Sequence, residues 1–320
     1  MRSKCNRAHL AIDSRPRIKK ELIGIAYTNV NNGLPLSRPR AFRLRLRTFL
    51  RHTQLARILF VIGLMLASVG LWEVAWRSFP RPASGTLRFD QPPTTRPYSL
   101  PVSLKIATFN MHSGYGADGK FDLQRTASIL KVFDLVWLNE VHGGWPDQTV
   151  ELSKLTTLAG LFVPTERRWL RDSFGNGLLS RLPEVQWVRL PLESHTPGYR
   201  NALLSVVPMG GTKVTFLQTH LTRGADRRAQ LRAIATIFQS LAEPAVLMGD
   251  LNTTRDDPEL SSLLGSLGVT DAIAQVVDDP HPRIDWIITR GLRVRDAGVV
   301  DVGASDHPLY WAEIEPGVSR

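Results

Sequence analysis

The chain has 320 residues, enough for one large domain or two ordinary ones, and 43% of them are hydrophobic, as in globular proteins. Its single cysteine, Cys5, excludes an intrachain disulfide and a zinc site built from several thiolates. Residues 1–97 carry 18 Lys and Arg against four acids, whereas residues 98–320 carry 22 against 25, a net charge of −3. The C-terminal part therefore lacks the basic surface of a protein that binds DNA tightly without sequence preference.

The first 54 residues are basic and rich in Pro, Asn and Ser, without sustained periodicity, which predicts a disordered segment. Residues 55–76 are mostly apolar, with Arg57 near the start and Trp72 and Trp76 near the end. This pattern predicts one transmembrane signal-anchor helix with the tryptophans at the membrane interface. The alternatives are a cleaved signal peptide, disfavoured by the long basic segment, and a buried helix, disfavoured because every face is apolar.

The arginines near this helix are distributed unevenly. Many precede it, including Arg43, Arg47 and Arg51, and few follow it. This asymmetry predicts a single-pass membrane protein with a cytoplasmic N-terminus and an extracytoplasmic C-terminal domain. Residues 77–101 contain six prolines, which predicts an extended linker that holds this domain away from the bilayer.

From residue 102 to residue 316, short apolar runs alternate with helical patterns. The runs predict strands at Leu104–Phe109, Leu135–Leu138, Gly177–Leu179, Ala202–Val207, Val214–Gln218, Ala245–Met248, Asp285–Ile288 and Leu309–Ile314. Helical spacing predicts helices over Asp122–Val132, with Asp122 as N-cap, and over Arg227–Leu241. Many strands with few helices favour an α/β domain of two packed sheets flanked by helices.

Polar residues recur at the ends of these runs. They are Asn110, Glu140, Asn176, Arg200, His220, Asp250, Asn252, Asp285, Asp306 and His307. Side chains at strand ends meet in a shared crevice, so these residues can converge on one site. Carboxylate and amide oxygens suit a hard ion such as Mg²⁺, and an attacking water needs a base. Taken singly, most of these residues are better explained as turn formers or capping residues.

Seven short motifs cover most of residues 104–314. They are ATFNMHSG (107–114), LVWLNEV (135–141), GNGLLSR (175–181), QTHL (218–221), LMGDLN (247–252), RIDWII (283–288) and SDHPL (305–309). Each is weak alone, but the ordered set resembles the endonuclease/exonuclease/phosphatase family, which has the deoxyribonuclease-I-like fold. The resemblance implies a four-layer αββα sandwich of two mixed or antiparallel sheets.

The resemblance also implies a role for each matching residue. The implied ligands of a metal, Mg²⁺ or Mn²⁺, are Asn110, Glu140 and Asp306. The implied catalytic residues are His220, Asp250, Asn252, Asp285 and His307. The implied substrate-binding residues are Asn176 and Arg200. Within this set, Asp250 orients or deprotonates the attacking water, and Asp285 fixes the tautomer of His307 and favours its charged form.

The function implied is divalent-metal-dependent hydrolysis of a phosphate ester by an in-line water, at a membrane. The substrate could be a phospholipid headgroup, a sugar or inositol phosphate, or a nucleic acid, so a nuclease is one alternative. A non-catalytic binding module with a decayed metal site is the other, and the retained carboxylates, imidazoles and amides argue against it. Nothing in the sequence indicates an obligate protein partner. The arginines at positions 223, 227, 228 and 232 are better explained as a solvated helix face than as a substrate-facing strip.

Overall fold

The computed structural model describes residues 40–76, 81–89, 101–144, 146–168, 171–195, 198–277 and 283–317. The chain divides into two units, Met1–Ile62 and Gly63–Arg320, and helix α1 (Arg40–Trp76) crosses the division. The predictions made for residues 1–39 and for the linker residues 77–80 and 90–100 lie outside the described residues.

Helix α1 begins at Arg40, so residues 40–54 of the segment predicted to be disordered lie in this helix. Starting a helix is costly, whereas adding residues to an existing helix is not, so the arginine-rich flank continues the apolar helix. Within α1, Thr53–Trp72 is long and apolar enough to cross a membrane, with a mean hydropathy of 2.1. Its large apolar side chains are exposed, Leu71 by 73%. By length and composition alone, this helix agrees with the predicted span over residues 55–76.

Two sheets form the centre of the globular domain. Sheet A has the order β1-β6-β7-β8-β9-β11-β10, with β1 (Ala83–Arg88), β6 (Glu184–Leu192), β7 (Arg200–Met209), β8 (Thr212–His220), β9 (Ala245–Asp250), β10 (Val269–Asp271) and β11 (Asp285–Arg290). Sheet B has the order β12-β13-β2-β3-β5-β4, with β2 (Leu104–Asn110), β3 (Leu135–Val141), β4 (Ala159–Arg168), β5 (Arg171–Ser180), β12 (Leu292–Val300) and β13 (Leu309–Pro316). The helices are α2 (Leu123–Leu130), α3 (Gln148–Thr156), α4 (Arg227–Ser240) and α5 (Pro258–Leu264), with a 3₁₀ turn η1 at His112–Gly114.

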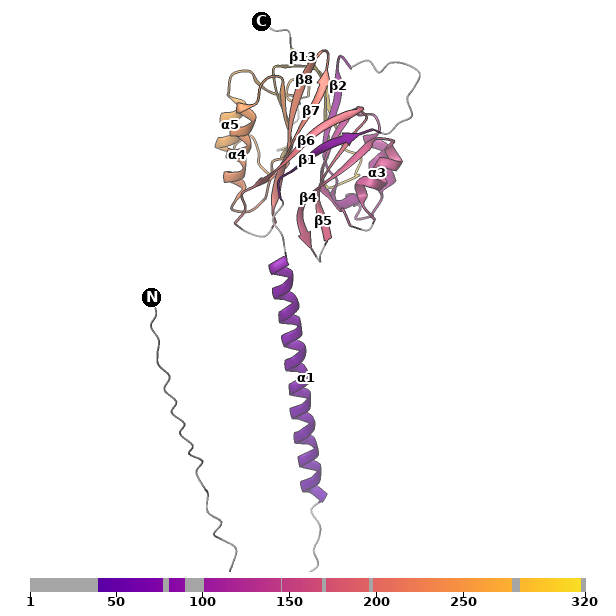
Figure 1. Cartoon of the computed structure of the whole chain (residues 1–320), viewed down its shortest axis with the longest axis vertical. Coiled ribbons are helices and arrows are strands. Elements are labelled where there is room, and N and C mark those ends of the chain that lie inside the picture. The colour runs from indigo at the N-terminus through magenta and orange to yellow at the C-terminus, as the bar shows by residue number, and fades with distance from the viewer. Residues whose placement is uncertain are drawn as a thin grey trace, which may run out of the picture. The chain divides into compact units, whose positions relative to one another are not determined.

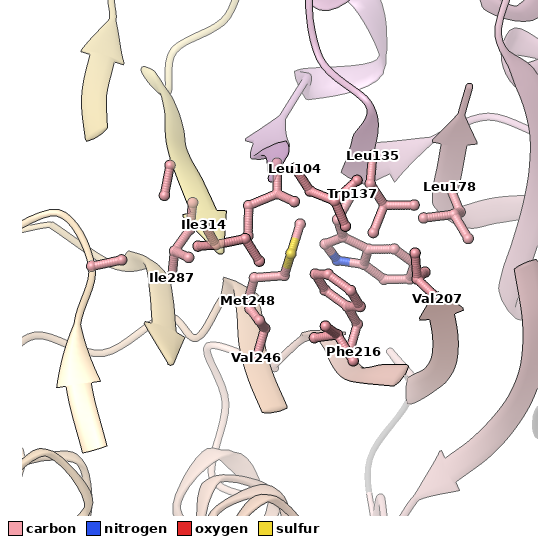
Figure 2. Close-up of a cluster of buried hydrophobic side chains, with 14 of the residues drawn as sticks. Leu104, Leu135, Trp137, Leu178, Val207, Phe216, Val246, Met248, Ile287 and Ile314 are labelled. Atoms are coloured by element: carbon pink, nitrogen blue, oxygen red, sulfur yellow. The ribbon is translucent and has the colours of Figure 1, made fainter. Parts of the chain in front are cut away.

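The helices cover the outer faces of the two sheets, which gives the predicted four-layer αββα sandwich (Figure 1). Helices α2 and α3 pack on sheet B, and α4 and α5 pack on sheet A. Along β3, Leu135 and Trp137 face the other sheet, whereas Val136 and Leu138 face the helices. A strand that is buried on both faces is apolar at every position, which is why the sequence shows short continuous runs. Between the sheets, Trp137 packs in one cluster with side chains of both sheets (Figure 2).

Strand β1 lies inside the predicted linker. Residues Ala83–Arg88 pair antiparallel with β6, from Ala83 opposite Arg189 to Arg88 opposite Glu184. The linker prediction over 77–101 is therefore wrong for these residues. The segment ASGTLR shows no alternation of apolar residues and is mostly exposed, because main-chain hydrogen bonds at the sheet edge hold it rather than side-chain burial.

Strand pairing brings the polar strand ends together. Parallel pairing of β2 with β3 sets Asn110 opposite Asn139, and parallel pairing of β8 with β9 sets His220 opposite Asp250. Strand β11 runs antiparallel to β9, so its first residue, Asp285, also lies opposite Asp250. The carboxyl ends of β2, β3, β8 and β9 therefore meet the start of β11.

Candidate active site

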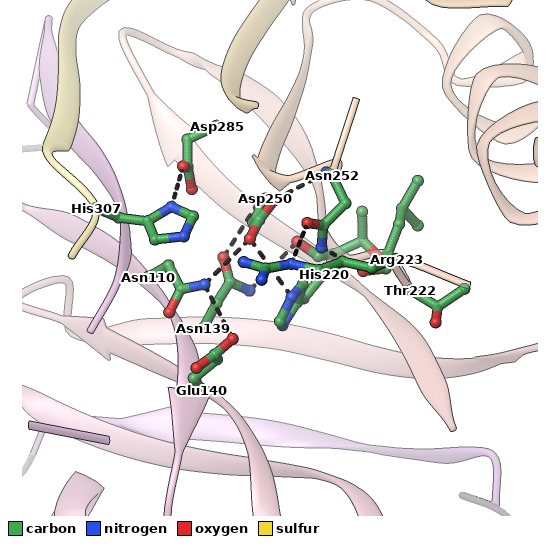
Figure 3. Close-up of polar contacts among 12 residues, drawn as sticks. Asn110, Asn139, Glu140, His220, Thr222, Arg223, Asp250, Asn252, Asp285 and His307 are labelled. Atoms are coloured by element: carbon green, nitrogen blue, oxygen red, sulfur yellow. Dashed lines mark hydrogen bonds and ion pairs between the residues drawn. The ribbon is translucent and has the colours of Figure 1, made fainter. Parts of the chain in front are cut away.

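A polar cluster lies where the strand ends meet, and it includes Asn110, Glu140, His220, Asp250, Asp285 and His307 (Figure 3). Asn110 connects the two sheets within this cluster. Its Nδ2 donates hydrogen bonds to Glu140 Oε1 at 3.2 Å and to Asp250 Oδ2 at 3.1 Å. Its Oδ1 accepts the backbone N–H of His112 at 3.2 Å. One buried amide thus holds side chains of β3 and β9 in a fixed relation.

Two residues of the cluster have a left-handed backbone, which is uncommon outside glycine. The φ angle is +58° at Glu140 and +49° at Asn252. Glu140 lies where the pairing of β3 with β5 shifts register, and such a bulge re-aims a side chain. Left-handed non-glycine residues cost about 1–3 kcal/mol each, and they concentrate at functional sites.

The Asp250 carboxylate is fully buried. Burial, together with the nearby charge of Asp285, raises the pKa of Asp250 to about 7. Its Oδ1 accepts the backbone N–H of Asn252 at 2.8 Å, which fixes the direction of the carboxylate. A carboxylate whose pKa lies near neutrality can take a proton from water and release it again.

His220 is also buried, and its Nε2 lies 3.5 Å from Asp250 Oδ2. Burial lowers the pKa of His220 well below its ordinary value, and the positive charges of Arg200, His307 and Arg223 lower it further. His220 is therefore a neutral imidazole near pH 7.

His307 is the opposite case. Its Nδ1 donates to Asp285 Oδ2 at 2.7 Å. Burial acts to lower the pKa of His307, but the hydrogen bond and charge of Asp285, with the charges of Asp250 and Asp306, outweigh it and raise the pKa to about 9. His307 is thus an imidazolium near pH 7, and the structure contains the predicted histidine–carboxylate pair.

Asn139 also belongs to this cluster, although neither the sequence pattern nor the family resemblance assigns it a role. Its Oδ1 accepts the backbone N–H of Asp250 at 3.2 Å, and its Nδ2 donates to Asn176 Oδ1 at 3.1 Å. Asn176 in turn donates to Asn201 Oδ1 at 3.4 Å. These three buried asparagines cross between the sheets and hold the main chain of Asp250. The available signal was an uncharged polar residue inside the buried run LVWLNEV.

The two predicted substrate-binding residues lie around this cluster. Asn176 is fully buried, and both ends of its amide are hydrogen-bonded to other asparagines. Arg200 begins β7, its Nη1 donates to the carbonyl of Tyr199 at 3.3 Å, and its charge acts on His220. The structure therefore places Arg200 within electrostatic reach of the cluster and Asn176 in the hydrogen-bonded layer behind it.

The third predicted metal ligand, Asp306, is half exposed and lies before β13. Its Oδ1 lies 3.6 Å from His112 Nδ1 and accepts Ser305 Oγ at 3.1 Å. Because the backbone of His112 is hydrogen-bonded to Asn110, Asp306 lies on the Asn110 side of the cluster. The charges of Asp306 and Glu140 both act on Asp285, which places the two acids around the same centre.

The donor set fits a divalent cation. Glu140 and Asp306 offer carboxylate oxygens and Asn110 an amide oxygen, the ligands that Mg²⁺ and Mn²⁺ prefer. Ligand atoms of Asp250, Asp285 and His307 also lie within 4.8 Å of one another. His307 is a poor ligand because it holds a proton at neutral pH.

Comparison with known proteins identifies the family of the chain. The sequence model of the endonuclease/exonuclease/phosphatase family matches residues 107–307. No curated protein matches the chain. Among solved structures, an endonuclease/exonuclease/phosphatase from Beutenbergia cavernae DSM 12333 is 27% identical, with a TM-score of 0.55, over 67% of this chain and 72% of that chain. The human Nocturnin catalytic domain with bound sulfate anion is 17% identical, with a TM-score of 0.54, over 73% of this chain and 97% of that chain, and shares the fold.

Proposed function

Because the chain belongs to the endonuclease/exonuclease/phosphatase family, we propose that it is a divalent-metal-dependent phosphoesterase that hydrolyses a phosphate ester with an in-line water. One observation carries the proposal: a single amide, that of Asn110, binds Glu140 from one sheet and Asp250 from the other. The carboxylate proposed to bind the metal, Glu140, and the carboxylate proposed to accept a proton from water, Asp250, are thus hydrogen-bonded to the same side chain. The intact cluster argues against a binding module with a decayed site.

The ionisation states of the cluster support one assignment of the proton transfers. Asp250 takes a proton from the water. The water oxygen attacks phosphorus at the same time, and the ester P–O bond breaks. Of His220 and His307, only His307 is protonated near neutral pH. His307 therefore stabilises the charge that develops on the phosphoryl oxygens and gives a proton to the leaving oxygen. Neutral His220 orients the phosphoryl group through a hydrogen bond.

The metal set of this proposal is Asn110, Glu140 and Asp306, with Mg²⁺ or Mn²⁺ as the ion. The bound ion would polarise a phosphoryl oxygen and offset its negative charge. Asn252 and Arg200 complete the proposal as groups that bind or orient the substrate, and Asn176 supports them from the layer behind by holding Asn139. Asn252 is held for this by its Nδ2, which donates to the carbonyl of Leu221 at 2.8 Å.

The proposed substrates are phosphate esters found beside a bilayer, with a phospholipid headgroup or an inositol phosphate favoured over nucleic acid. The near-neutral charge of residues 98–320 supports this order, because binding of nucleic acid rests on a basic surface. The apolar helix Thr53–Trp72 supports a membrane location. We propose that it anchors the chain with the N-terminus in the cytoplasm and the catalytic domain outside it, since arginines precede the helix.

The test uses the full-length chain in detergent with Mg²⁺ or Mn²⁺. Bis-p-nitrophenyl phosphate, inositol phosphates, phospholipids, RNA and plasmid DNA are offered in parallel. Metal-dependent hydrolysis that is lost in His307→Ala and kept in His195→Ala, an exposed histidine outside the cluster, supports the proposal. Preferred cleavage of RNA or DNA would make the chain a nuclease. Absence of both hydrolysis and metal binding would favour the binding module.

A further inference from the structure

Arg223 reaches into the catalytic cluster from the loop after β8. Its Nε donates to Asn252 Oδ1 at 3.0 Å. Figure 3 shows the guanidinium extending past Asn252, pointing toward His220 and Asp250. The bond to Asn252 uses only Nε, so it leaves the N–H donors on both Nη atoms for a ligand.

The other arginines of this region have acidic partners or lie on the outer helix face. Arg232 pairs with Glu259, and Arg227 lies 3.6 Å from Asp257. Arg228 is exposed on α4. Within the described part of the chain, Arg223 alone of these four both contacts the cluster and has no carboxylate in ion-pair contact. Arg223 is exposed as well, but it differs from the other three because its charge acts on buried His220 and its side chain is bonded to Asn252.

A cation without an acidic partner, held by a hydrogen bond and aimed at a catalytic centre, suits an anion. We propose that Arg223 is a substrate-binding residue whose two Nη atoms bind the non-bridging oxygens of the phosphoryl group that is hydrolysed. A planar guanidinium matches two phosphoryl oxygens at once, as a lysine ammonium does not. The hydrogen bond to Asn252 fixes the direction of this fork. The inference rests on the proposed function, since it assigns a ligand to the same centre.

The test measures binding of inorganic phosphate to the full-length chain in detergent by calorimetry, with Mg²⁺ and with chelator. Arg223→Ala should weaken binding about 10- to 100-fold, as expected for loss of charge-assisted hydrogen bonds. Arg223→Lys should lie between wild type and Arg223→Ala. The matched control, Arg228→Ala, removes the same charge from the exposed helix face and should change binding less than about twofold.

Arg223→Gln separates substrate binding from support of Asn252. The Nε2 of glutamine is as many bonds from the backbone as the Nε of arginine, so it can keep the hydrogen bond to Asn252. Glutamine lacks the positive charge and the two Nη donors of arginine. If Arg223 only supports Asn252, Arg223→Gln restores phosphate binding and the inference is wrong. The inference would also be wrong if Arg223→Ala and Arg228→Ala weakened phosphate binding equally, or if the wild-type protein bound no phosphate.

The same variants distinguish this inference from the proposed function. Arg223-dependent phosphate binding without hydrolysis of any ester would contradict the enzyme but keep the anion site. Hydrolysis with an unchanged KM in Arg223→Gln would keep the enzyme and remove Arg223 from the substrate site. An increase in KM of about tenfold or more in Arg223→Gln supports both.

Discussion

His307 Nδ1 lies 2.7 Å from Asp285 Oδ2, and the two side chains are 9% and 2% exposed, so the protein holds an ion pair inside its polar cluster. Asp285→Asn removes the charge that keeps the pKa of His307 at about 9, while the burial that lowers this pKa remains. Since the reaction needs the imidazolium, activity of the wild type should persist up to about pH 9. In Asp285→Asn the alkaline limb of the kcat/KM profile should move down by at least about two pH units.

The control for this shift is Asp256→Asn, which removes an exposed carboxylate away from the pair. Its pH profile should match that of the wild type. An alkaline limb that stays in place in Asp285→Asn would mean that His307 is not the group that titrates there.

Asp250→Asn should make the protein less sensitive to alkaline pH when metal is removed with a chelator, although it loses the acceptor for Asn110 Nδ2 at every pH. The pKa of Asp250 is raised from 3.8 to about 7, so its contribution to folding is fully present below pH 3.8 and is lost as pH rises through 7. The amide does not titrate and keeps an oxygen for the N–H of Asn252. The free energy of unfolding of the variant, relative to that of the wild type, should be higher at pH 8 than at pH 5 by about 2 kcal/mol. Urea denaturation at both pH values measures it, and a difference that does not change with pH would contradict the assignment.

Glu140→Gln should raise the Mg²⁺ concentration required for half-maximal activity by about tenfold or more, because a neutral amide is a weaker ligand for a divalent cation. The amide oxygen can still accept the hydrogen bond from Asn110, so the fold should be kept. Titration of activity with Mg²⁺ measures the effect, with Glu151→Gln on the exposed side of α3 as control. The same metal dependence in both variants would remove Glu140 from the ligand set.

Asn139→Ala should lower both stability and turnover. It leaves the backbone N–H of Asp250 and the Oδ1 of Asn176 buried without a partner, at about 1–3 kcal/mol for each group. Asn201 is the last of the three hydrogen-bonded asparagines, and it bonds to Asn176 instead of to Asp250. Asn201→Ala should therefore lower stability by a similar amount but should reduce turnover less. Equal losses of turnover at matched stability would show that Asn139 has no positioning role.

The membrane orientation can be tested with a periplasmic reporter fused after Ser319 in a bacterial host. We expect an active reporter, because the arginines before the apolar helix retain the N-terminus in the cytoplasm. Changing Phe60 and Leu64 to aspartate should abolish insertion, at about 2.5–3.5 kcal/mol for each charge at the helix centre. The control places aspartate at the exposed positions Val132 and Leu267 of the globular domain. A reporter active only in the cytoplasm would reverse the orientation.

The layers of the fold were predictable because its central strands are buried on both faces. Runs such as Leu135–Leu138 and Ala245–Met248 carry apolar residues at every position, and a polar residue marks the end of each. Strand β1 was not predictable in this way, because an edge strand held by main-chain hydrogen bonds leaves no side-chain pattern.

The catalytic candidates were predictable by residue type and place, but their contacts were not. That Asp285 lies opposite Asp250 depends on antiparallel pairing between strands far apart in the chain. The place of Asn139 was not predictable, because it hydrogen-bonds a backbone group and no residue spacing encodes such a contact. Arg223 resembled its neighbours in sequence, and only its direction separates it from them.

The pairing of β1 with β6 decides which fragments of this chain can be handled in solution. A fragment that begins at Tyr98, after the prolines, would lack β1 and leave the main-chain groups of β6 unpaired at the edge of sheet A. Exposed edges of this kind add strands from neighbouring molecules. Recombinant protein cut there would tend to aggregate even with its catalytic residues intact, whereas one that starts before Arg81 would keep the edge covered.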